Sequence, residues 1–555
     1  MTPVERYDVV VLGTAAAGLT AALRAAADGA RVGLFEKADQ VGGTTAWSGG
    51  VAWLPGNRHQ REPGLEDSRD QVLTYLTALS HGLIDPALAA VFVDTAPEVV
   101  DWLEDSSPVV FETVRGLSDY HPEHPGGRRE GRSVECPLFP FDELGAWAGR
   151  VARGYQLRGE IAMSETPLGR RAPDGVPREE LRRRQERDER ACGQALVGRL
   201  LKGLLDRGVE PRTGCRGERL LVEQGRIAGV LLTGPDGPFA ARATGGVVLA
   251  TGGFEHDAEL VRAFLRGPLE RPVSVPTNTG DGLRMAMRVG ASLANMREAW
   301  WVAAIDVPAS GGGVVAWQVN SERTRPGTVF VNRDGQRFTD EAANYNALGN
   351  ALHVVDVARF DYVNSPAWMV FDHAYLTTYG LAGRTASEPT PDWIITSPTV
   401  AGLAERIAVP PTALEATLSR WNAHVAEGHD PDHRRGESHH DRAWGDTARF
   451  GETRRATLGP LDTAPFHAVQ VRVGALGTKG GPRTDGDARV LDVDGVPMPG
   501  LYAAGNAMAS VMGMTYGGHG GTLGPALVFG LRAGRDAAAR ALAGAAATSA
   551  PAPAG

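Results

Sequence analysis

This sequence has few cysteines, no positive net charge and no long apolar run. Its three cysteines are far apart and in no metal-like spacing: Cys136, Cys192 and Cys215. We therefore expect a reduced cytoplasmic protein with no metal site and no structural disulfide. The net charge of −9 argues against nucleic acid as a partner. The sequence has no run of about 18 apolar residues, which predicts no transmembrane helix, and its N-terminus does not resemble a signal peptide.

Glycine, by contrast, is plentiful, with 71 residues gathered in a few segments of the 555-residue chain. A chain of this length suggests about two to four domains. Its 42% hydrophobic and 22% charged residues are those of an ordinary soluble protein. The glycine-rich segments are candidate binding loops, because glycine lets the backbone approach a flat ligand and direct free N–H groups at it.

The N-terminal residues have the pattern of a dinucleotide-binding βαβ unit. The expected strand, helix and second strand occupy residues 7–12, 19–28 and 32–35. Gly13 would permit the tight turn and Gly18 the close packing of helix on strand. Glu36, 23 residues after Gly13, would hydrogen-bond a ribose hydroxyl. Ala15 replaces the second glycine of the fingerprint, and its methyl group narrows the approach to the pyrophosphate without closing it.

Three later segments repeat the strand-to-glycine pattern. Residues 42–50 form a second glycine-rich loop, and residues 246–254 and 500–506 each carry an apolar strand that ends in small residues. In open α/β sheets the ligand binds where strands end in this way. A second loop so close behind the first suits a flavin dinucleotide better than a nicotinamide one, because the longer ligand needs backbone contact at its pyrophosphate and again at its isoalloxazine ring.

Together these segments resemble the FAD-dependent flavoproteins of the fumarate reductase/succinate dehydrogenase superfamily over nearly the whole chain. The resemblance implies an α/β fold. A Rossmann-like FAD-binding domain (1–276 and 474–540) would be interrupted by an α+β catalytic domain (277–473), and a disordered tail would follow at 541–555. Members with covalent flavin carry a histidine where Gly43 stands, so we expect noncovalent FAD. The residues expected to bind it are Gly13, Ala15, Ala16, Ala17, Gly18, Glu36, Lys37, Gly42, Gly43, Thr44, Thr45, Ser48, Gly49, Gly50, Ala250, Thr251, Gly252, Asp281, Gly505, Asn506, Gly521, Thr522 and Leu523.

Within the interrupting domain the sequence predicts several local features. Prolines mark a domain boundary near residues 271–276, and a helix is expected over residues 283–289. A hairpin is expected over residues 328–338, with its turn at Asp334-Gly335. The polar stretch 428–436 is expected to be a solvated surface loop, and not a metal site despite its histidine and aspartate residues.

A lone tyrosine, Tyr516, stands among the glycines of residues 512–525, just before an expected helix. Its phenol and the free N–H groups of the neighbouring glycines could hold a carbonyl oxygen that gains negative charge during a reaction. The same pattern also fits a glycine-rich turn that packs one aromatic ring.

A closer resemblance is to the 3-ketosteroid Δ1-dehydrogenases, and it is carried by residues 43–57, 119–135, 337–345 and 511–520. These enzymes introduce a double bond between C1 and C2 of a 3-ketosteroid. The resemblance implies that Tyr516 and the Gly520 N–H bind the C3 carbonyl. It also implies that Tyr345 removes the C2 proton, that Tyr120 hydrogen-bonds Tyr345 and relays the proton outward, and that hydride passes from C1 to flavin N5.

The sequence departs from this family in the loop between the two carbonyl-binding residues. The family often has proline there, whereas this chain has Gly517-Gly518-His519. We expect a more mobile loop, with His519 facing either the substrate or solvent. An uncharged steroid also needs an apolar pocket, for which residues 300–305 and 368–371 are candidates, although both segments fit plain core packing equally well.

Other functions remain open. A ketosteroid dehydrogenase that acts at C4–C5, or a dehydrogenase of another cyclic ketone, would use the same Tyr516 and Gly520 pair. A fumarate- or urocanate-type reductase would need arginines, for which the candidates are Arg323, Arg325 and Arg337. A catalytically silent FAD scaffold would need none of these groups. A quinone is a plausible electron acceptor, which would allow loose membrane association.

Overall fold

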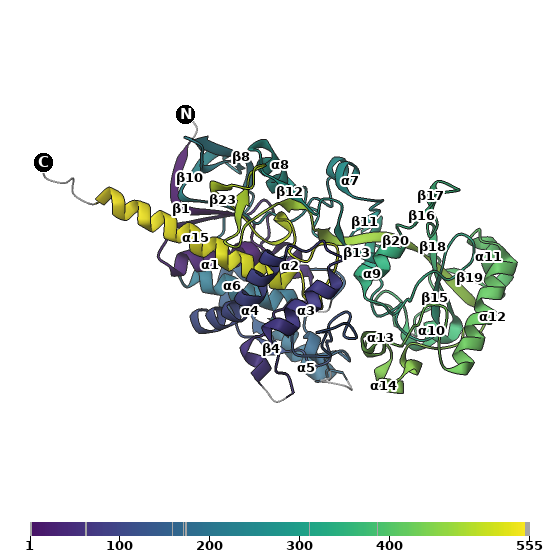
Figure 1. Cartoon of the computed structure of the whole chain (residues 1–555). Helices are drawn as coiled ribbons and strands as arrows, with labels where there is room; N and C mark the ends of the chain where they lie inside the picture. Colours follow the sequence, from purple (N-terminus) through teal and green to yellow (C-terminus); the bar gives the residue numbers. More distant parts are fainter. Residues whose placement is uncertain are drawn as a thin grey trace, which may run out of the picture.

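The computed structural model consists of two lobes that lie side by side, with β11, β13 and β20 between them (Figure 1). It describes residues 3–61, 64–157, 159–169, 171, 175–309, 311–385 and 387–549. Within these residues each lobe is built on its own seven-stranded sheet. No helix in this part of the chain is both long and apolar enough to cross a membrane. The expected α/β fold is confirmed.

The sheet of the first lobe has the order β2-β1-β10-β23-β22, and β9 and β8 extend it from β10. Strands β2, β1, β10 and β23 are parallel. Residues 9–12 of β1 are fully buried, as expected for a parallel strand that is covered on both faces. The strands are β1 (Val4–Leu12), β2 (Val32–Phe35), β8 (Arg216–Glu223), β9 (Arg226–Gly234), β10 (Gly237–Leu249), β22 (Arg489–Leu491) and β23 (Pro497–Ala503).

Helix α15 crosses this lobe and packs along α1 (Figure 1). The helices of the lobe are α1 (Ala16–Ala27), α2 (Gly43–Trp47), α3 (Arg69–Leu79), α4 (Pro86–Ser106), α5 (Arg178–Glu186), α6 (Cys192–Leu205), α7 (Ala258–Phe264), α8 (Asp281–Arg288) and α15 (Leu523–Ser549). Its short strands are β3 (Ala52–Trp53), β4 (Glu112–Thr113), β5 (Ser133–Glu135), β6 (Phe139–Pro140), β7 (Glu189–Arg190), β12 (Leu293–Ala294) and β21 (Gly481–Pro482).

The sheet of the second lobe has the order β14-β13-β20-β18-β15, and β11 and β19 also pair with β20. The strands are β11 (Arg271–Pro272), β13 (Ala299–Pro308), β14 (Val314–Gln318), β15 (Thr328–Val331), β16 (Val355–Asp356), β17 (Asp361–Tyr362), β18 (Ala367–Asp372), β19 (Ile395–Ser397) and β20 (Phe466–Thr478). The helices are α9 (Tyr345–Ala351), α10 (His373–Tyr379), α11 (Val400–Arg406), α12 (Pro411–Glu427), α13 (His439–Trp444) and α14 (Thr447–Phe450).

Strand β13 joins the two lobes because its alternate side chains enter different cores. Trp300, Val302 and Ala304 pack in the core of the first lobe, whereas Trp301 and Ala303 pack in that of the second. This follows from the two-residue period of a strand. Residues 368–371 of β18 pack in the second lobe only, on both faces of its sheet, which favours the core-packing interpretation of that segment.

Several expected elements are confirmed and others need correction. The expected βαβ unit is present, and α8 covers most of the helix expected over 283–289. The second glycine-rich segment is not entirely a loop, because residues 43–47 form helix α2. The turn at Asp334-Gly335 is present, with Gly335 N donating to Asn332 O at 2.9 Å. Its second strand, however, is reduced to a single bridge between Val331 and Arg337, and the full-length partner of β15 is β18.

The stretch 428–436 is not a solvated loop throughout. Asp430 and Arg435 are fully buried. Arg337 bridges Asp430 (2.9 Å) and Glu341 (2.7 Å), and Arg435 also contacts Glu341 (3.1 Å). These charges are buried because each is paired within the network, which the local composition alone does not reveal.

The C-terminal end also differs from expectation. Helix α15 continues through Ser549, so residues 541–549 are helical and not disordered. Residues 550–555 lie outside the described residues. The domain boundaries after 276 and 473 stay predictions. The second of them falls inside β20, whose residues 474 and 475 pair with β11 and β13 in the second sheet.

Candidate active site

Three tyrosines from distant parts of the chain meet where the lobes join. Tyr120 lies in the loop between β4 and β5, Tyr345 is the first residue of α9, and Tyr516 lies in the loop before α15. The ring centroids are 5.4 Å apart for Tyr120 and Tyr345, 4.9 Å for Tyr120 and Tyr516, and 5.5 Å for Tyr345 and Tyr516. All three are buried. The Tyr120 hydroxyl lies 3.4 Å from His519 Nδ1, and the Tyr516 hydroxyl lies 3.4 Å from the Thr522 hydroxyl.

Local hydrogen bonds hold each of these tyrosines in place. Asn344 caps α9 by accepting from Ala347 N through its side chain, which fixes the start of the helix at Tyr345. The backbone N–H of Tyr120 donates to Gly517 O (3.0 Å), and the Tyr75 hydroxyl donates to the same oxygen (2.6 Å). The Tyr120 segment and the glycine loop are therefore hydrogen-bonded directly to each other.

A buried ion pair supports the Tyr120 loop from behind. Arg132 bridges Asp67 and Asp119, both at 2.7 Å, and all three side chains are almost fully buried. Asp119 also accepts from the indole N–H of Trp53 (2.8 Å). Because Arg132 contacts both carboxylates and Asp119 also accepts from Trp53, the network holds the backbone next to Tyr120.

Gly520 has a backbone conformation that only glycine adopts easily. Its φ is +90°, and a Cβ there would lie 2.3 Å from Val51 O. Its carbonyl accepts from Trp53 N (3.0 Å) and Gly524 N (2.8 Å). Among the described residues nothing accepts from its N–H. The Gly520 N–H and the Tyr516 hydroxyl are therefore two donors in one short loop.

Burial raises the pKa of all three tyrosines. The pKa values of Tyr120 and Tyr345 lie well above 10, and that of Tyr516 is also raised. At neutral pH the three phenols are protonated. Such a phenol is a good hydrogen-bond donor, and it becomes a base only when a neighbour or the substrate assists the loss of its own proton.

At the nucleotide-binding end, the turn between β1 and α1 has the geometry that the sequence predicts. Gly13 has a φ of +105°, and a Cβ there would lie 2.2 Å from Ala250 O. A Cβ at Gly18 would lie 2.0 Å from Gly13 O, so this glycine does allow close packing of helix on strand. Glu36 accepts from the N–H (3.0 Å) and hydroxyl (2.7 Å) of Thr14, which places its carboxylate beside the turn.

The second glycine-rich segment packs against that turn. Ala16 N donates to the Thr45 hydroxyl (3.1 Å), and a Cβ at Gly43 would lie 3.4 Å from the Ala15 methyl group. Gly42 has a φ of +105°, and Gly50, with a φ of +70°, approaches the backbone of Cys192. The other expected residues of this segment, found in the same 42–50 stretch, are Thr44, Ser48 and Gly49.

The remaining expected FAD-binding residues surround the same region. A Cβ at Gly505 would lie 3.0 Å from the Ala17 methyl group. Lys37 pairs with Asp281 (2.9 Å), and Asn506 accepts from the Trp300 indole (3.0 Å). The others directly follow the C-terminal end of β10 or lie at the start of α15: Ala250, Thr251, Gly252, Gly521, Thr522 and Leu523.

These residues fit an FAD. The start of α1 carries only methyl groups at residues 15–17 and is flanked by Gly43 and Gly505, which leaves this helix N-terminus approachable by a pyrophosphate. One N–H there, that of Ala16, already donates to Thr45. The Thr251 hydroxyl is buried and has no hydrogen-bond partner among the described residues, as expected for a group that a ligand would satisfy.

Sequence reasoning missed several residues at this site. Lys479 is fully buried, donates to Thr515 O (2.7 Å) and lies 4.2 Å from the centroid of the Trp300 ring. Burial lowers its pKa to about 7. His519 and Trp444 stack on each other beside Tyr120, with His440 nearby. No motif marks Lys479, His440 or Trp444. The expectation that His519 faces solvent is wrong, because the residue is only 7% exposed and its ring packs against Trp444 and Tyr120, whereas its place relative to the substrate stays a prediction.

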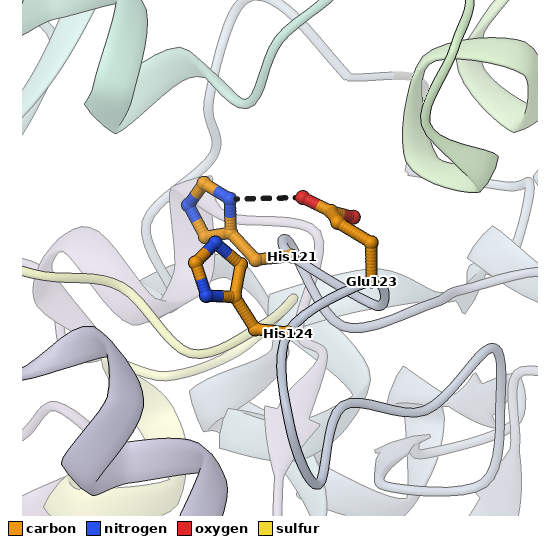
Figure 2. A group of neighbouring side chains, drawn as sticks. All are labelled: His121, Glu123 and His124. Atoms are coloured by element: carbon orange, nitrogen blue, oxygen red, sulfur yellow. Dashed lines mark ion pairs between the residues drawn. The ribbon is translucent and has the colours of Figure 1, made fainter.

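Two groups of described residues have donor atoms close enough to hold a metal ion: His121 with Glu123 and His124, and His424 with Asp430 and Asp432. Figure 2 shows that the first group lies on one loop, with His121 Nδ1 paired to Glu123 at 3.6 Å. The Asn344 amide nitrogen donates to His121 Nε2 (3.0 Å). That contact leaves the imidazole proton on Nδ1, which opposes metal binding there. In the second group, Asp430 is already occupied by Arg337.

Comparisons with known proteins identify the family to which the chain belongs. The FAD binding domain family matches residues 8–523. The chain is 41% identical to the 4-oxocyclohexanecarboxylate 2-dehydrogenase of Sinomonas cyclohexanicum, over 97% of this chain and 94% of that protein. It is 36% identical to the 3-oxosteroid 1-dehydrogenase of Mycolicibacterium smegmatis, over 97% of this chain and 98% of that protein.

The fold comparison points the same way. The crystal structure of 3-ketosteroid Δ1-dehydrogenase from Sterolibacterium denitrificans in complex with 1,4-androstadiene-3,17-dione superposes with a TM-score of 0.89. It is 32% identical and covers 96% of this chain and 99% of that one. A flavocytochrome c3 fumarate reductase shares the fold, with a TM-score of 0.65. The chain therefore belongs to the FAD binding domain family, and it is an FAD-dependent oxidoreductase that acts on CH–CH groups.

Proposed function

We propose that this chain desaturates a six-membered cyclic ketone next to its carbonyl, with the A ring of a 3-ketosteroid as the substrate and C1–C2 as the bond oxidised. The observation that carries this proposal is the meeting of three buried tyrosines, one of them four residues before Gly520, whose N–H has no acceptor among the described residues. The relatives and the solved structure named for 3-oxosteroid dehydrogenation support the substrate class.

In the proposed reaction, Tyr516 and Gly520 bind the ketone oxygen. Two donors aimed at one oxygen stabilise the negative charge that develops there as the neighbouring carbon loses its proton. This stabilisation acidifies the C2 proton, so a phenol becomes a sufficient base. The raised pKa of Tyr516 keeps its donor proton in place at neutral pH.

In this scheme Tyr345 acts as a tyrosinate, which Tyr120 stabilises by donating a hydrogen bond to it. The tyrosinate removes the C2 proton and becomes a neutral phenol, and Tyr120 passes that proton outward. Bound FAD supplies the acceptor for the hydride that leaves C1. The substrate thereby loses one proton and one hydride, and a C1–C2 double bond forms. FAD would be held noncovalently by the turn after β1, the 42–50 segment and the glycines before α15, since Gly43 offers no side chain for a covalent link.

A second candidate substrate is a monocyclic keto acid of the 4-oxocyclohexanecarboxylate type. The relative of that name is more similar in sequence (41%) than the 3-oxosteroid dehydrogenase of M. smegmatis (36%). Both reactions oxidise the bond next to a ring ketone, so the same tyrosines and glycine would serve either one. The difference would lie in the pocket beyond the ketone.

A fumarate-type reduction is a poorer fit. Such chemistry needs free arginines to bind carboxylates, yet Arg337 is held by Glu341 and Asp430, and Arg323 donates to the carbonyl of Ala343 (2.7 Å). Arg325 lies over the ring of Tyr379. A substrate carboxylate would have to displace these contacts.

The test is anaerobic mixing of the holoenzyme with androst-4-ene-3,17-dione or with 4-oxocyclohexanecarboxylate, followed by loss of the oxidised-flavin absorbance. The position of the new double bond is then determined in the product. Bleaching by the steroid with loss of two hydrogens at C1–C2 supports the proposal, and bleaching by the keto acid alone supports the second candidate. Bleaching only by a saturated 3-ketosteroid would mean C4–C5 chemistry. No bleaching by any of these ketones would overturn both.

A further inference from the structure

The imidazole of His519 lies between Trp444 of the second lobe and Tyr120 of the first. Trp444 Nε1 donates to His519 Nε2 at 3.1 Å, and the two rings stack with centroids 5.1 Å apart and planes 16° apart. On the other side, His519 Nδ1 lies 3.4 Å from the Tyr120 hydroxyl oxygen. Ser133 holds the loop by donating to the His519 carbonyl (2.9 Å).

The indole determines which nitrogen of His519 carries the proton. An indole N–H can only donate, so Nε2 must be the unprotonated nitrogen. A neutral imidazole has one N–H, which is then on Nδ1. Burial lowers the pKa of His519 to about 3, so the ring is neutral at physiological pH. The Nδ1–H group therefore faces the Tyr120 oxygen as a donor.

A Tyr120 hydroxyl that accepts from His519 directs its own proton elsewhere. The ring of Tyr345 has its centroid 5.4 Å from that of Tyr120, and its hydroxyl is the acceptor that the proposed reaction needs. We propose that His519, with its tautomer fixed by Trp444, is a positioning residue that orients the Tyr120 hydroxyl as a donor to Tyr345. The inference rests on the proposed function. A hydrogen bond to the Tyr120 oxygen strengthens its own O–H as a donor, which stabilises negative charge on Tyr345.

Other polar groups around this chain of hydrogen bonds are compatible with it. The His440 ring lies 5.1 Å from that of Tyr120 and 5.7 Å from that of His519. Burial lowers its pKa well below 6.5, so it is neutral. The Arg323 guanidinium acts to lower the pKa of Tyr120, which favours negative charge in the tyrosine cluster. Tyr516 is the third tyrosine next to this chain of hydrogen bonds, with its ring centroid 4.9 Å from that of Tyr120.

The kinetic test is the pH dependence of anaerobic flavin reduction by the ketone that bleaches the wild-type enzyme. His519→Ala removes the donor. We expect about a tenfold slower reduction and an acidic limb moved up by about one pH unit, the effect of losing one hydrogen bond. His519→Asn keeps an amide donor close to the Nδ1 position, and it should restore most of the rate. Trp444→Phe keeps an aromatic ring stacked on His519 but no longer fixes the tautomer of the imidazole. It should also move the acidic limb of the pH profile to higher pH.

Matched controls separate this role from a merely structural one. Trp421→Phe removes another buried indole donor, which bonds Gly459 O at 2.9 Å in the second lobe. His467→Asn changes another fully buried histidine, whose Nδ1 contacts Thr396. Neither should move the pH profile. The FAD content of every variant is measured, so that a loss of cofactor is not mistaken for a change in proton transfer.

A direct readout of the tautomer uses the holoenzyme labelled with ¹⁵N-histidine, in which the His519 signals are those missing from His519→Asn. The Nδ1–H form is expected in wild type, and a mixture of tautomers in Trp444→Phe. An Nε2–H form in wild type, or an unshifted pH profile in FAD-replete His519→Ala, would overturn the inference. If no ketone reduces the wild-type flavin, the proposed function fails, while the NMR result still decides the hydrogen-bond order.

Discussion

At the scale of single residues, the site depends on buried phenols whose protons are controlled by their neighbours. Burial alone would make Tyr345 a weak candidate for a base, because it disfavours the tyrosinate. Binding of the ketone oxygen by Tyr516 and Gly520 would lower the barrier to proton transfer by acidifying the substrate. The Tyr120 hydroxyl would lower it by stabilising the tyrosinate form of Tyr345. The same burial favours Tyr516 as a donor, since it stays protonated.

Tyr516→Phe and Tyr345→Phe should each slow turnover by about 10² to 10³ while retaining FAD, because one removes a carbonyl donor and the other the base. The measurement is steady-state turnover with an artificial electron acceptor, together with the flavin content. Tyr375→Phe is the matched control, since it removes another buried phenol, which donates to Glu322 O at 2.8 Å. Near wild-type turnover in either site variant would remove that residue from the mechanism.

Lys479 gives a pH-dependent prediction at the same scale. Its pKa of about 7 in the folded protein lies below the usual 10.5. Between these pH values the unfolded chain binds more protons at this residue, so its contribution makes stability rise with pH. Lys479→Met should reduce the rise of the unfolding temperature between pH 7 and pH 9.5 relative to wild type. An identical pH dependence in the two proteins would contradict the lowered pKa.

At the scale of elements, glycines control how closely strands and loops approach. Gly13 and Gly520 both have positive φ. A Cβ would clash with a carbonyl oxygen at both positions, at 2.2 Å for Gly13 and 2.3 Å for Gly520. The first lies in the turn before α1, and the second lies in the loop that carries Tyr516. In both places the positive φ and the close carbonyl oxygen exclude a side chain.

Gly13→Ala should abolish FAD binding, because the new methyl group would lie about 2.2 Å from Ala250 O. Gly29→Ala is the control: its φ is +89°, but no atom lies within 4 Å of a Cβ there. It should cost about 1 kcal/mol of stability through the backbone alone and keep the flavin. The measurement is the ratio of flavin to protein absorbance after purification. Full flavin content in Gly13→Ala would contradict the assigned turn.

At the scale of the whole molecule, the site is assembled from both lobes. Tyr120 and Tyr516 belong to the first lobe and Tyr345 to the second. Contacts such as Asn344 with His121 (3.0 Å) and Trp444 with His519 (3.1 Å) join the lobes around the tyrosines. Strand β13, which enters both cores, makes this junction a packed interface.

Acid precipitation of the whole holoenzyme should release the yellow cofactor into the supernatant, because noncovalent FAD has no attachment once the lobe unfolds. The described residues 42–50 contain no histidine that could form a covalent link. The flavin in supernatant and pellet is measured by its absorbance. Flavin that stays with the pellet would show that a covalent link exists elsewhere in the chain.

Much of the fold could be predicted from the sequence because its signals are local. A buried strand, a glycine turn and a helix follow one another within a few residues, and their order is sufficient to indicate the βαβ unit at Gly13. Composition alone gives the wrong structure for the tail and for the stretch 428–436, because it shows neither how far a helix continues nor which buried charges pair. Alanine-rich residues extend α15, and Arg337 neutralises Asp430 across about 90 residues of chain.

The sequence by itself determined the flavin-binding architecture, the loop that carries Tyr516 and the glycine required at residue 520. These depend on backbone conformation and on neighbours in the chain. Only the tertiary structure decided which rings surround Tyr120, that Lys479 is buried, and which nitrogen of His519 carries a proton. Those properties depend on contacts between segments hundreds of residues apart, such as His519 with Tyr120, and on burial, which neither composition nor spacing specifies.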